Sequence, residues 1–394
     1  MSNIVLKGST SGDVTITVPA AAGTNTVTIP AATGNLPLSN LDHVTNRPNA
    51  KPLIINGDMN ICQRGTSTTG ITSTGIAVQD RFSRVMGGAG TWTQTSDTDV
   101  PAGQGFTKSM KWDCTTAADL SDAGQVFSIR YIFEAQDVQL LKYGTSSAEK
   151  LTLSFWIKSP KTGTHVLSFY QYDDARHVGK AYTISSANTW TKVVCSIPGD
   201  TTGVFDNNTG AGLGVEIGLS AGSTYTSGTL PTTWAGYSAA NQWVGQVNCA
   251  DNTANNVFIT GVQLEIGEFD STTIPPFQHE DLQDNFFRCQ RYYQNQGANF
   301  CGMVEGTDKF RFQVAFDRPM RVAPSITARG SGFKFNARYL GDHTTDNPTI
   351  ADAASTTFGT WLGVNGTSLT GNTPIYGRSQ QDAAGQFLAL SAEI

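Results

Sequence analysis

The stretch LTLSFWIK, residues 151–158, decides the fold class because apolar and polar side chains alternate along it. The apolar set is Leu151, Leu153, Phe155 and Ile157, and the other set is Thr152, Ser154, Trp156 and Lys158. Successive side chains of a strand point to opposite faces of a sheet, so a period of two indicates a strand with one buried face. The stretch therefore predicts a β-strand at the edge of a hydrophobic core.

Strand-like patterns recur on both sides of this stretch, from residue 52 to residue 278. A hydrophobic strand is predicted to begin at 52–55, and the run 262–266 alternates as 151–158 does. Turn residues separate further strand-like runs at 90–96, 106–113, 125–133, 165–172, 189–197 and 213–220. One short helix is predicted from Asp137 to Tyr143. Many short strands with Gly- and Asn-rich turns predict an all-β fold, with a jelly-roll β-sandwich over 52–278.

The composition agrees with a chain of more than one β domain. A single core rarely grows beyond ~250–300 residues, and this chain has 394, so we expect two or three domains. Charged residues make up 15%, below the ~25% of typical soluble chains, and the 41 glycines favour turns over long helices.

Several partners and compartments are not expected. The formal net charge is −6 and no block of Lys or Arg stands out, so we expect no nucleic-acid partner, which needs clustered cations. No apolar run reaches the ~18 residues of a transmembrane helix, so we expect no membrane insertion. The opening MSNIVLKGST lacks the apolar region of a secretory signal, which predicts folding in a cytosol. There the six widely spaced cysteines are expected to be small buried hydrophobic residues.

Residues 1–40 form a segment of a different kind. The stretch VTITVPAAAGTNTVTIPAATGN, residues 14–35, nearly repeats itself and has no large side chains with which to build a core. Prolines at two equivalent positions remove ladder donors, so neither copy suits a central strand. We expect an extended segment that other subunits or another protein stabilise, and a loose leader otherwise. The residues predicted to make this attachment are Val18, Pro19, Ile29 and Pro30. Polar residues 41–51 are predicted to be a linker.

The segment EDLQDNFFRCQRYYQ, residues 280–294, has the best helical pattern in the chain and predicts a connecting helix within 279–295. One face of this helix carries Leu282, Phe286, Cys289 and Tyr293. The stripe is narrow, like the seam of a coiled coil. It is therefore predicted either to pack on the sandwich of its own chain or to form a seam between subunits.

Residues 296–394 return to β patterns and are predicted to form a small C-terminal β domain. Aromatic and aliphatic residues alternate with others over 310–316, and the chain ends in the strand-like FLAL. The polar segments 341–357 and 364–375 are predicted to be long loops, which commonly carry binding sites on a rigid scaffold.

The sequence has no motif that identifies an enzyme. Residues 218–222 match G-x-S-x-G, but the turn-like residues that follow argue against the strand–turn–helix context that a nucleophilic serine needs. No P-loop, H-E-x-x-H or EF-hand loop occurs, so we expect no cofactor and no metal. The acids Asp173, Asp174, Glu265 and Glu268 are predicted to be solvated surface groups. We therefore expect no catalytic residues.

Aromatic side chains are the remaining sign of a ligand site. Their flat faces bind sugar rings in many jelly-roll modules, because axial C–H groups pack on the π face. Trp156 lies opposite the apolar set of 151–157, and Trp361 and Tyr376 belong to the C-terminal domain. These three residues are the predicted ligand-binding residues, with burial in the core as the alternative.

Six blocks of the sequence carry a resemblance to a known family. They are IINGDMNICQRGTS at 54–67, QDRFSR at 79–84, LTLSFWIKSPKTGTH at 151–165, TWTKVVCSIPGD at 189–200, FITGVQLEIG at 258–267 and RCQRYYQ at 288–294. Together they resemble bacteriophage tail fibre and receptor-binding proteins. The N-terminal repeats and the run VAFDRPMRVAPSI at 314–326 are similar to segments of such fibres. The resemblance implies a jelly-roll domain similar to carbohydrate-binding modules, followed by a variable tip.

The resemblance also implies a function. It predicts a virion structural protein of a phage tail, a homotrimeric fibre that binds host surface polysaccharide during adsorption. Its partners would be its own copies, other tail proteins bound through the N-terminal segment, and host glycan. It would be assembled in the bacterial host cytoplasm and located in the virion tail. The alternatives are a glycan-cleaving tailspike, a head-decoration or baseplate protein, and a free-standing lectin.

Overall fold

The computed structural model describes residues 3–7, 13–17, 51–296, 299–305, 309–328, 332–337, 341–346, 350–356, 359–365, 374–380 and 388–394. In most strands between residues 299 and 380 it describes the backbone alone. Contacts divide the chain into two units, Met1–Asn46 and Arg47–Ile394. No helix of the described residues is long and apolar enough to span a membrane.

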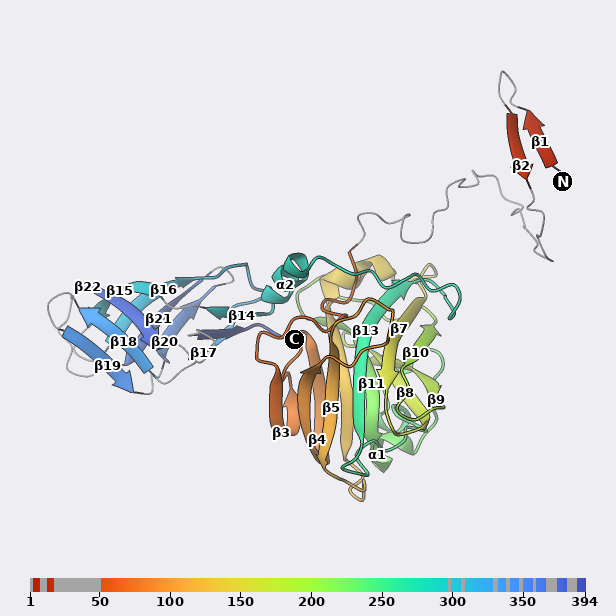
Figure 1. Cartoon of the computed structure of the whole chain (residues 1–394), viewed down its shortest axis with the longest axis horizontal. Helices are drawn as coiled ribbons and strands as arrows, with labels where there is room; N and C mark the ends of the chain where they lie inside the picture. The colour runs from red at the N-terminus through yellow and green to blue at the C-terminus, as the bar shows by residue number, and fades with distance from the viewer. Residues whose placement is uncertain are drawn as a thin grey trace. The chain divides into compact units, whose positions relative to one another are not determined.

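Eleven strands of the second unit form one antiparallel sheet that folds over itself into two layers (Figure 1). One layer contains β6 (Val126–Glu134), β11 (Ala211–Ala221), β8 (Gly163–Gln171), β9 (Arg176–Ile184) and the short β12 (Ala235–Gly236). The other contains β5 (Ser109–Thr116), β13 (Asn256–Ile266), β7 (Leu151–Lys158) and β10 (Thr191–Ile197). The all-β fold with a jelly-roll β-sandwich, which the sequence predicts, is confirmed.

Strand β4 (Phe82–Asp97) belongs to both layers. Its first half pairs with β6 and its second half pairs with β5. The strand changes layer at Gly88 and Gly90, whose φ angles of 65° and 80° favour glycine. A Cβ at Gly90 would lie 2.3 Å from the carbonyl oxygen of Thr116, so no larger residue fits at this corner.

The core lies between the two layers. The four apolar residues of 151–157 are fully buried, as their alternation predicts. Ring contacts join the layers, because Trp112 of β5 lies 5.1 Å from Phe127 of β6, and Phe155 of β7 lies 5.6 Å from Tyr182 of β9, between ring centroids. Burial of one such side chain stabilises the fold by ~1.5–3 kcal/mol. Four of the five cysteines that the structure describes as free are also buried, namely Cys114, Cys195, Cys249 and Cys289.

The sequence pattern missed three strands of the sandwich, β9, the two-residue β12 and β3 (Ser67–Gly75). β3 pairs with β4 alone, and Ile71 is its one buried residue, so it shows no alternation. The predicted helix near Asp137 is confirmed as the 3-10 helix η1 (Ala135–Leu141).

The strand predicted to begin at 52–55 is wrong, because residues 53–59 form turns. Asn56, with φ of 61°, stands at the centre of these turns. Its side-chain amide donates hydrogen bonds to the carbonyl oxygens of Ile61 and Asp80 at 2.9 and 3.0 Å, and its oxygen accepts one from the Ile61 amide at 2.8 Å. The Asn56 side chain therefore replaces the ladder that a strand would need.

Two smaller sheets follow helix α2 (Leu282–Gln290). One contains, in this order, β14 (Tyr293–Gln296), β23 (Leu388–Ser391) and β17 (Ser325–Ala328). The other contains, in this order, β19 (Gly341–Asp346), β18 (Gly332–Ala337), β22 (Pro374–Gln380), β15 (Asn299–Glu305), β16 (Lys309–Ala315), β21 (Gly359–Asn365) and β20 (Ile350–Ser355). The long loop predicted over 341–357 is therefore wrong, because β19 and β20 pair with neighbouring strands in spite of their polar composition. Residues 366–373 of the other predicted loop lie outside the described residues.

In the first unit, β1 (Asn3–Lys7) pairs antiparallel with β2 (Asp13–Thr17). This pairing corrects the expectation that the opening stretch finds no partner in its own chain. The predicted attachment residues Val18, Pro19, Ile29 and Pro30 lie outside the described residues.

Candidate functional site

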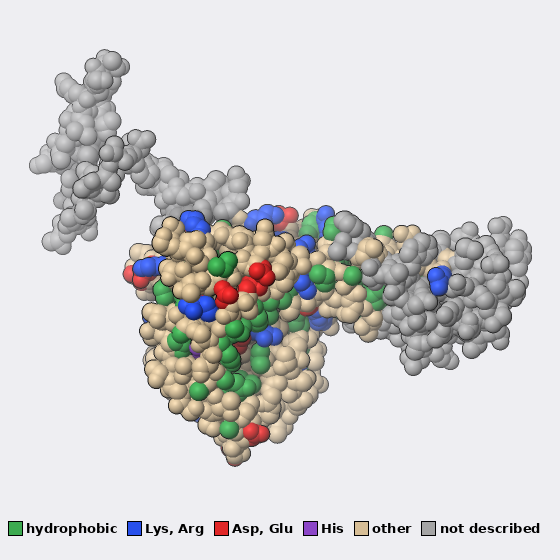
Figure 2. All heavy atoms as spheres, turned by 180° about the vertical axis from the view of Figure 1, so that it is seen from behind, with side chains coloured by type: hydrophobic (Ala, Val, Ile, Leu, Met, Phe, Trp, Pro, Cys, Tyr) green, Lys and Arg blue, Asp and Glu red, His purple; other side chains and the backbone are tan. Residues whose placement is uncertain are grey.

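A cleft of about 260 Å³ lies on the outer face of the layer that contains β6, β11 and β8. Its lining comes from β4, β6, β8 and β11 and from the connection that follows β11. The cleft is slightly smaller than the ~300–1,000 Å³ of pockets for drug-sized ligands. Figure 2 shows hydrophobic side chains gathered in a hollow on the rear surface of the sandwich.

Glycines in β11 make room for the cleft. The strand reads AGLGVEIGLSA, with Leu213, Val215, Ile217 and Leu219 in the core and glycines at alternate positions on the other face. A Cβ at Gly214 would lie 2.9 Å from the Tyr172 ring, and one at Gly218 would lie 2.8 Å from the Trp243 ring. Both rings therefore pack directly against the backbone of the sheet.

Three tyrosine rings line one end of the cleft. The Tyr170 ring lies 4.7 Å from that of Tyr172 and 5.2 Å from that of Tyr237, with interplanar angles of 81° and 89°. Edge-to-face contacts of this kind stabilise the arrangement of the rings. Tyr237 is 40% exposed, so this end of the cleft is open to solvent. Burial raises the pKa of Tyr172 to about 12, so its hydroxyl stays protonated and able to donate.

The connection between β11 and β13 forms the wall of the cleft. It contains α1 (Ser223–Thr226) and η2 (Ala239–Asn241). Trp243, which is 1% exposed, packs with Val126 and Val166 in a small apolar cluster outside the main core. This cluster fixes the wall to the face of the sheet.

Arg130 of β6 and Glu216 of β11 lie opposite each other in the ladder. Glu216 is 6% exposed and accepts a hydrogen bond from the Ser128 hydroxyl at 2.9 Å. Burial raises the pKa of Glu216, although the Arg130 charge and the Ser128 bond oppose it. Arg130 donates over longer distances, 3.4 Å to Ser83 Oγ and 3.5 Å to the Tyr172 hydroxyl. Among the described residues, no ion pair joins Arg130 to any carboxylate.

Two buried polar atoms of β8 and β9, Ser168 Oγ and His177 Nε2, have no hydrogen-bond partner in the described part of the chain. Both residues are 1% exposed. Ser168 is the ladder partner of Glu216 on β8, and the His177 ring lies 5.2 Å from the Tyr237 ring. Burial lowers the pKa of His177, so its imidazole is neutral near pH 7. Neither residue lines the cleft, so these two atoms lie beneath its surface.

The predicted ligand-binding residues lie elsewhere. Trp156 is half-buried in β7, which belongs to the opposite layer, and it does not line the cleft. Trp361 lies in β21 opposite Gln313, and Tyr376 lies in β22 opposite Cys301. The side chains of Trp361 and Tyr376 lie outside what the structure describes.

A signal for the cleft was nevertheless present in the run 213–220. Its inward positions are apolar, while its outward positions include Gly214, Glu216 and Gly218. Glycine within a strand often marks a place where another group approaches the backbone closely. The tyrosines that approach it come from other strands and loops, so the run by itself does not identify them.

The four residues of the predicted seam do not share one exposed face. Helix α2 ends at Gln290, short of the predicted boundary, so Tyr293 lies in β14 and is buried. Cys289 is fully buried in the core of its own sandwich. Leu282, which is 62% exposed, and Phe286 line an open groove of about 610 Å³. Contacts within the chain therefore account for the burial of Cys289 and Tyr293, the second half of the predicted stripe.

The G-x-S-x-G match is not a nucleophile elbow. Ser220 lies within β11, is 1% exposed, and accepts a hydrogen bond from a backbone amide at 3.1 Å. The single-turn helix α1 follows where the sequence predicts a turn. Asp173 and Asp174 accept hydrogen bonds from the backbone amides of the loop 204–206, so these carboxylates hold a loop in place.

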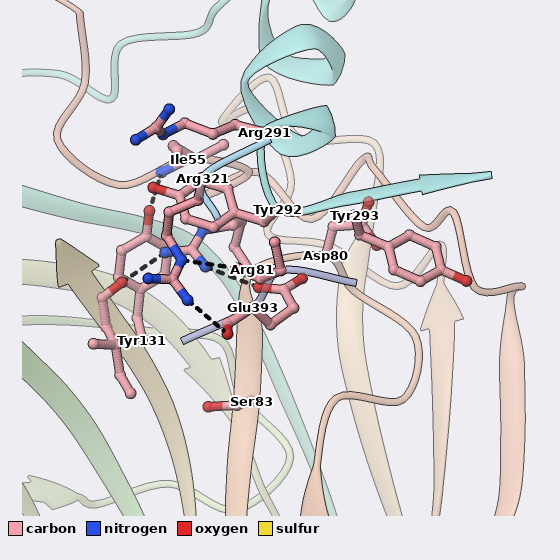
Figure 3. A network of polar contacts seen from close by, with 12 residues as sticks. Ile55, Asp80, Arg81, Ser83, Tyr131, Arg291, Tyr292, Tyr293, Arg321 and Glu393 are labelled. Atoms are coloured by element: carbon pink, nitrogen blue, oxygen red, sulfur yellow. Dashed lines mark hydrogen bonds and ion pairs between the residues drawn. The ribbon is translucent and has the colours of Figure 1, made fainter. Parts of the chain in front are cut away.

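Three of the six blocks with the family resemblance meet in a buried polar network (Figure 3). Near the end of the chain, Glu393 accepts hydrogen bonds from Arg64 at 3.1 Å and from Arg81 at 2.9 Å. Arg64 also pairs with Asp80 at 2.9 Å, and the Arg81 guanidinium carbon lies 3.5 Å from the centroid of the Tyr292 ring. We call this network the junction. Because its charges are paired with one another, these motif residues hold the fold together.

Glu134, at the end of β6, extends the junction. Its carboxylate accepts two hydrogen bonds from Arg291, both at 2.8 Å, and one from the Tyr292 hydroxyl at 2.7 Å. Arg321 donates to the carbonyl oxygens of Ala392 at 2.8 Å and Glu393 at 3.2 Å. The last residues of the chain are thereby fixed to the sandwich.

No family model and no curated protein matches this sequence. Among solved structures, the enzymatically active domain of bacteriophage CBA120 tailspike protein 4 is similar with a TM-score of 0.28 and 14% identity, over 55% of this chain and 21% of that chain. A candidate sugar binding protein from Bacteroides thetaiotaomicron is similar with a TM-score of 0.28 and 15% identity, over 55% of this chain and 100% of that chain. The N-terminal CBM22 tandem domain of Paenibacillus barcinonensis Xyn10C has a TM-score of 0.25 and 8% identity, over 87% of this chain and 98% of that chain.

The match to the tailspike spans only about a fifth of that protein's domain. At TM-scores this low, these likenesses decide neither the fold nor the function. The cleft has to be interpreted from its own geometry.

Proposed function

We propose that the cleft binds a host surface glycan and that the chain is a virion protein of a phage tail, a homotrimeric fibre that acts in adsorption. The observation that carries this proposal is the cleft itself, where edge-to-face tyrosines line the same hollow as the Arg130 and Glu216 side chains. Sugar rings offer C–H faces for the tyrosines and hydroxyls that both donate and accept. The six sequence blocks support the phage tail as the setting.

The cleft supports binding without cleavage. Glycosidases use two carboxyl groups on either side of the scissile bond. Among the described lining residues, Glu216 is the one carboxylate. A small cleft binds one or two sugar units weakly, and copies in a trimer would raise the avidity by roughly 10²–10⁴. The N-terminal segment would attach the fibre to other tail proteins during assembly in the host cytoplasm.

The first test is binding of the full chain to an array of bacterial surface polysaccharides. The variant Tyr237→Ala changes an exposed ring of the cleft, and Trp156→Ala changes an aromatic residue on the opposite layer. We expect Tyr237→Ala to weaken binding ~10-fold, because stacked aromatic residues are typical hot spots, and Trp156→Ala to change it less than twofold. Full binding by Tyr237→Ala together with loss in Trp156→Ala would move the site to β7. Release of sugar fragments by the wild type would favour a tailspike instead.

The second test is the solution mass of the full chain by light scattering. The monomer is 42.0 kDa, so a trimer has a mass of about 126 kDa, three times that value. A monomer at all concentrations would contradict an autonomous trimeric fibre and would favour a lectin.

A further inference from the structure

The polar side of the cleft presents an acceptor and a donor on neighbouring strands. Arg130 and Glu216 are ladder partners, which places their backbones ~5 Å apart. The Ser128 hydroxyl holds the Glu216 carboxyl, while the Arg130 guanidinium keeps donors that no carboxylate of the described chain occupies. The unpartnered Oγ of Ser168 comes next in the same row.

The apolar side of the cleft lies around Val126, near the start of β6. Val126 precedes Ser128 on the same face, and Val85 of β4 is the ladder partner of Ser128. On the other side, Ser128 pairs with Gly218, over which the Trp243 ring lies. Val126, Val85 and Trp243 pack together in one apolar cluster. Ser128 therefore stands between a polar side and an apolar side of the same cleft.

The parts of an acetamido group are complementary to the acceptor, the donor and the apolar surface of the cleft. Its N–H donates, its carbonyl accepts, and its methyl group is apolar, all within one small planar unit. A hydroxyl at the same position of a sugar offers no methyl group, and a free amine is charged and offers no acceptor. The cleft has its donor Arg130 and its apolar Val126 four residues apart on β6, and its acceptor Glu216 beside Arg130 on β11.

Building on the proposed glycan binding, we propose that the cleft selects N-acetylated amino sugars. The acetamido N–H donates to Glu216, its carbonyl accepts from Arg130, and its methyl group packs against Val85 and Trp243. The sugar ring then lies against the tyrosines.

Calorimetric titration of the full chain tests this selectivity with matched pairs of saccharides. Chitotriose is compared with cellotriose, and N-acetylgalactosamine with galactose. We expect the acetylated member of at least one pair to bind ~10-fold or more tightly, because a site that pairs polar groups with its ligand rejects analogues that leave them unpaired.

Two matched variants locate the methyl group. Val85→Thr keeps the shape of the side chain but sets a hydroxyl against the methyl group, and should reduce the preference for acetylated sugars several-fold. Val194→Thr makes the same change at a half-buried outward position of β10, on the opposite layer, and should leave the preference unchanged.

The outcomes separate this inference from the proposed function. Equal affinity for acetylated and plain sugars, still weakened by Tyr237→Ala, overturns the acetamido selectivity and leaves glycan binding in place. A preference that Val85→Thr does not reduce overturns the placement of the methyl group. Saccharide binding that Tyr237→Ala leaves intact, or the absence of any saccharide binding, overturns the proposed use of the cleft itself.

Discussion

Glu134 and Glu216 are two buried carboxylates of the same layer in very different surroundings. Glu134, which is fully buried, accepts four hydrogen bonds, two of them from the Arg291 guanidinium and the others from Tyr292 and Gln136. Glu216, which is 6% exposed, accepts one hydrogen bond, from Ser128. Burial alone would raise the pKa of both, yet the bonds from Arg291 and Tyr292 hold the pKa of Glu134 below its usual range.

The difference separates a structural network from the proposed binding site. In the junction, each carboxylate is matched by a guanidinium of the same chain. In the cleft, by contrast, the Arg130 guanidinium has no ion pair within the described residues. Paired charges such as those of the junction stabilise the fold, whereas the guanidinium of Arg130, which lines the cleft, is the group that the proposed ligand would use.

The largest expected effect comes from exchanging each carboxyl for an amide. Glu134→Gln leaves Arg291 without its charge partner and should lower the free energy of unfolding by about 2–3 kcal/mol, less than for a fully buried pair because Arg291 is 36% exposed. Glu216→Gln removes a charge that has no ion pair, so it should change the free energy of unfolding by less than about 1 kcal/mol. Denaturation in urea measures both. Equal losses would show that the cleft is a structural network like the junction.

The glycines of the cleft floor should give the next largest effect. Gly218→Ala drives a methyl group against the Trp243 ring, so we expect a loss of ~1–3 kcal/mol in stability from overpacking, together with weaker glycan binding. Gly87→Ala, where an added Cβ meets nothing within 4 Å, is the control and should cost less than ~0.5 kcal/mol. A neutral Gly218→Ala would show that the cleft wall moves freely.

The two glutamates should also give opposite pH dependences of stability. The lowered pKa of Glu134 adds stability above its ordinary pKa of 4.5, which is lost as the pH falls through the folded-state pKa. The raised pKa of Glu216 adds stability below 4.5, which is lost as the pH rises through its folded-state pKa. The stability advantage of wild type over Glu134→Gln should therefore shrink in acid. The stability of Glu216→Gln relative to wild type should grow as the pH rises above 4.5. Unfolding curves at a series of pH values test this, and parallel profiles would contradict it.

The smallest expected effect concerns the exposed rim of the cleft. The Tyr237 hydroxyl donates to Gln242 at 3.1 Å. Tyr237→Phe keeps the ring but loses this bond, so we expect glycan affinity to fall about twofold to fivefold, with little change in stability. Calorimetric titration of the full chain with a saccharide that the wild type binds measures this change in affinity. A loss as large as that of Tyr237→Ala would assign the binding energy to the hydroxyl rather than to the ring.

Much of the sandwich was predictable from local pattern. Alternation over 151–158 and 262–266 identifies strands whose inward residues are buried, because a period of two is a property of the extended backbone itself. The pattern failed at 52–55, where Asn56 bonds to Asp80 and to the Asn285 side chain. Those partners lie far along the chain, and local propensity contains no information about them.

The sequence by itself determined the all-β class and the mostly buried set of cysteines. Only the tertiary structure decided where the cleft lies. Arg130, Glu216 and Ser168 are separated by dozens of residues and become neighbours through the ladder of β6, β11 and β8. The register of that ladder is set by long-range pairing and by the core on the opposite face, not by the residues of the cleft. For the same reason the sequence pointed to Trp156, whose outward position it showed correctly, but not to the cleft on the opposite layer.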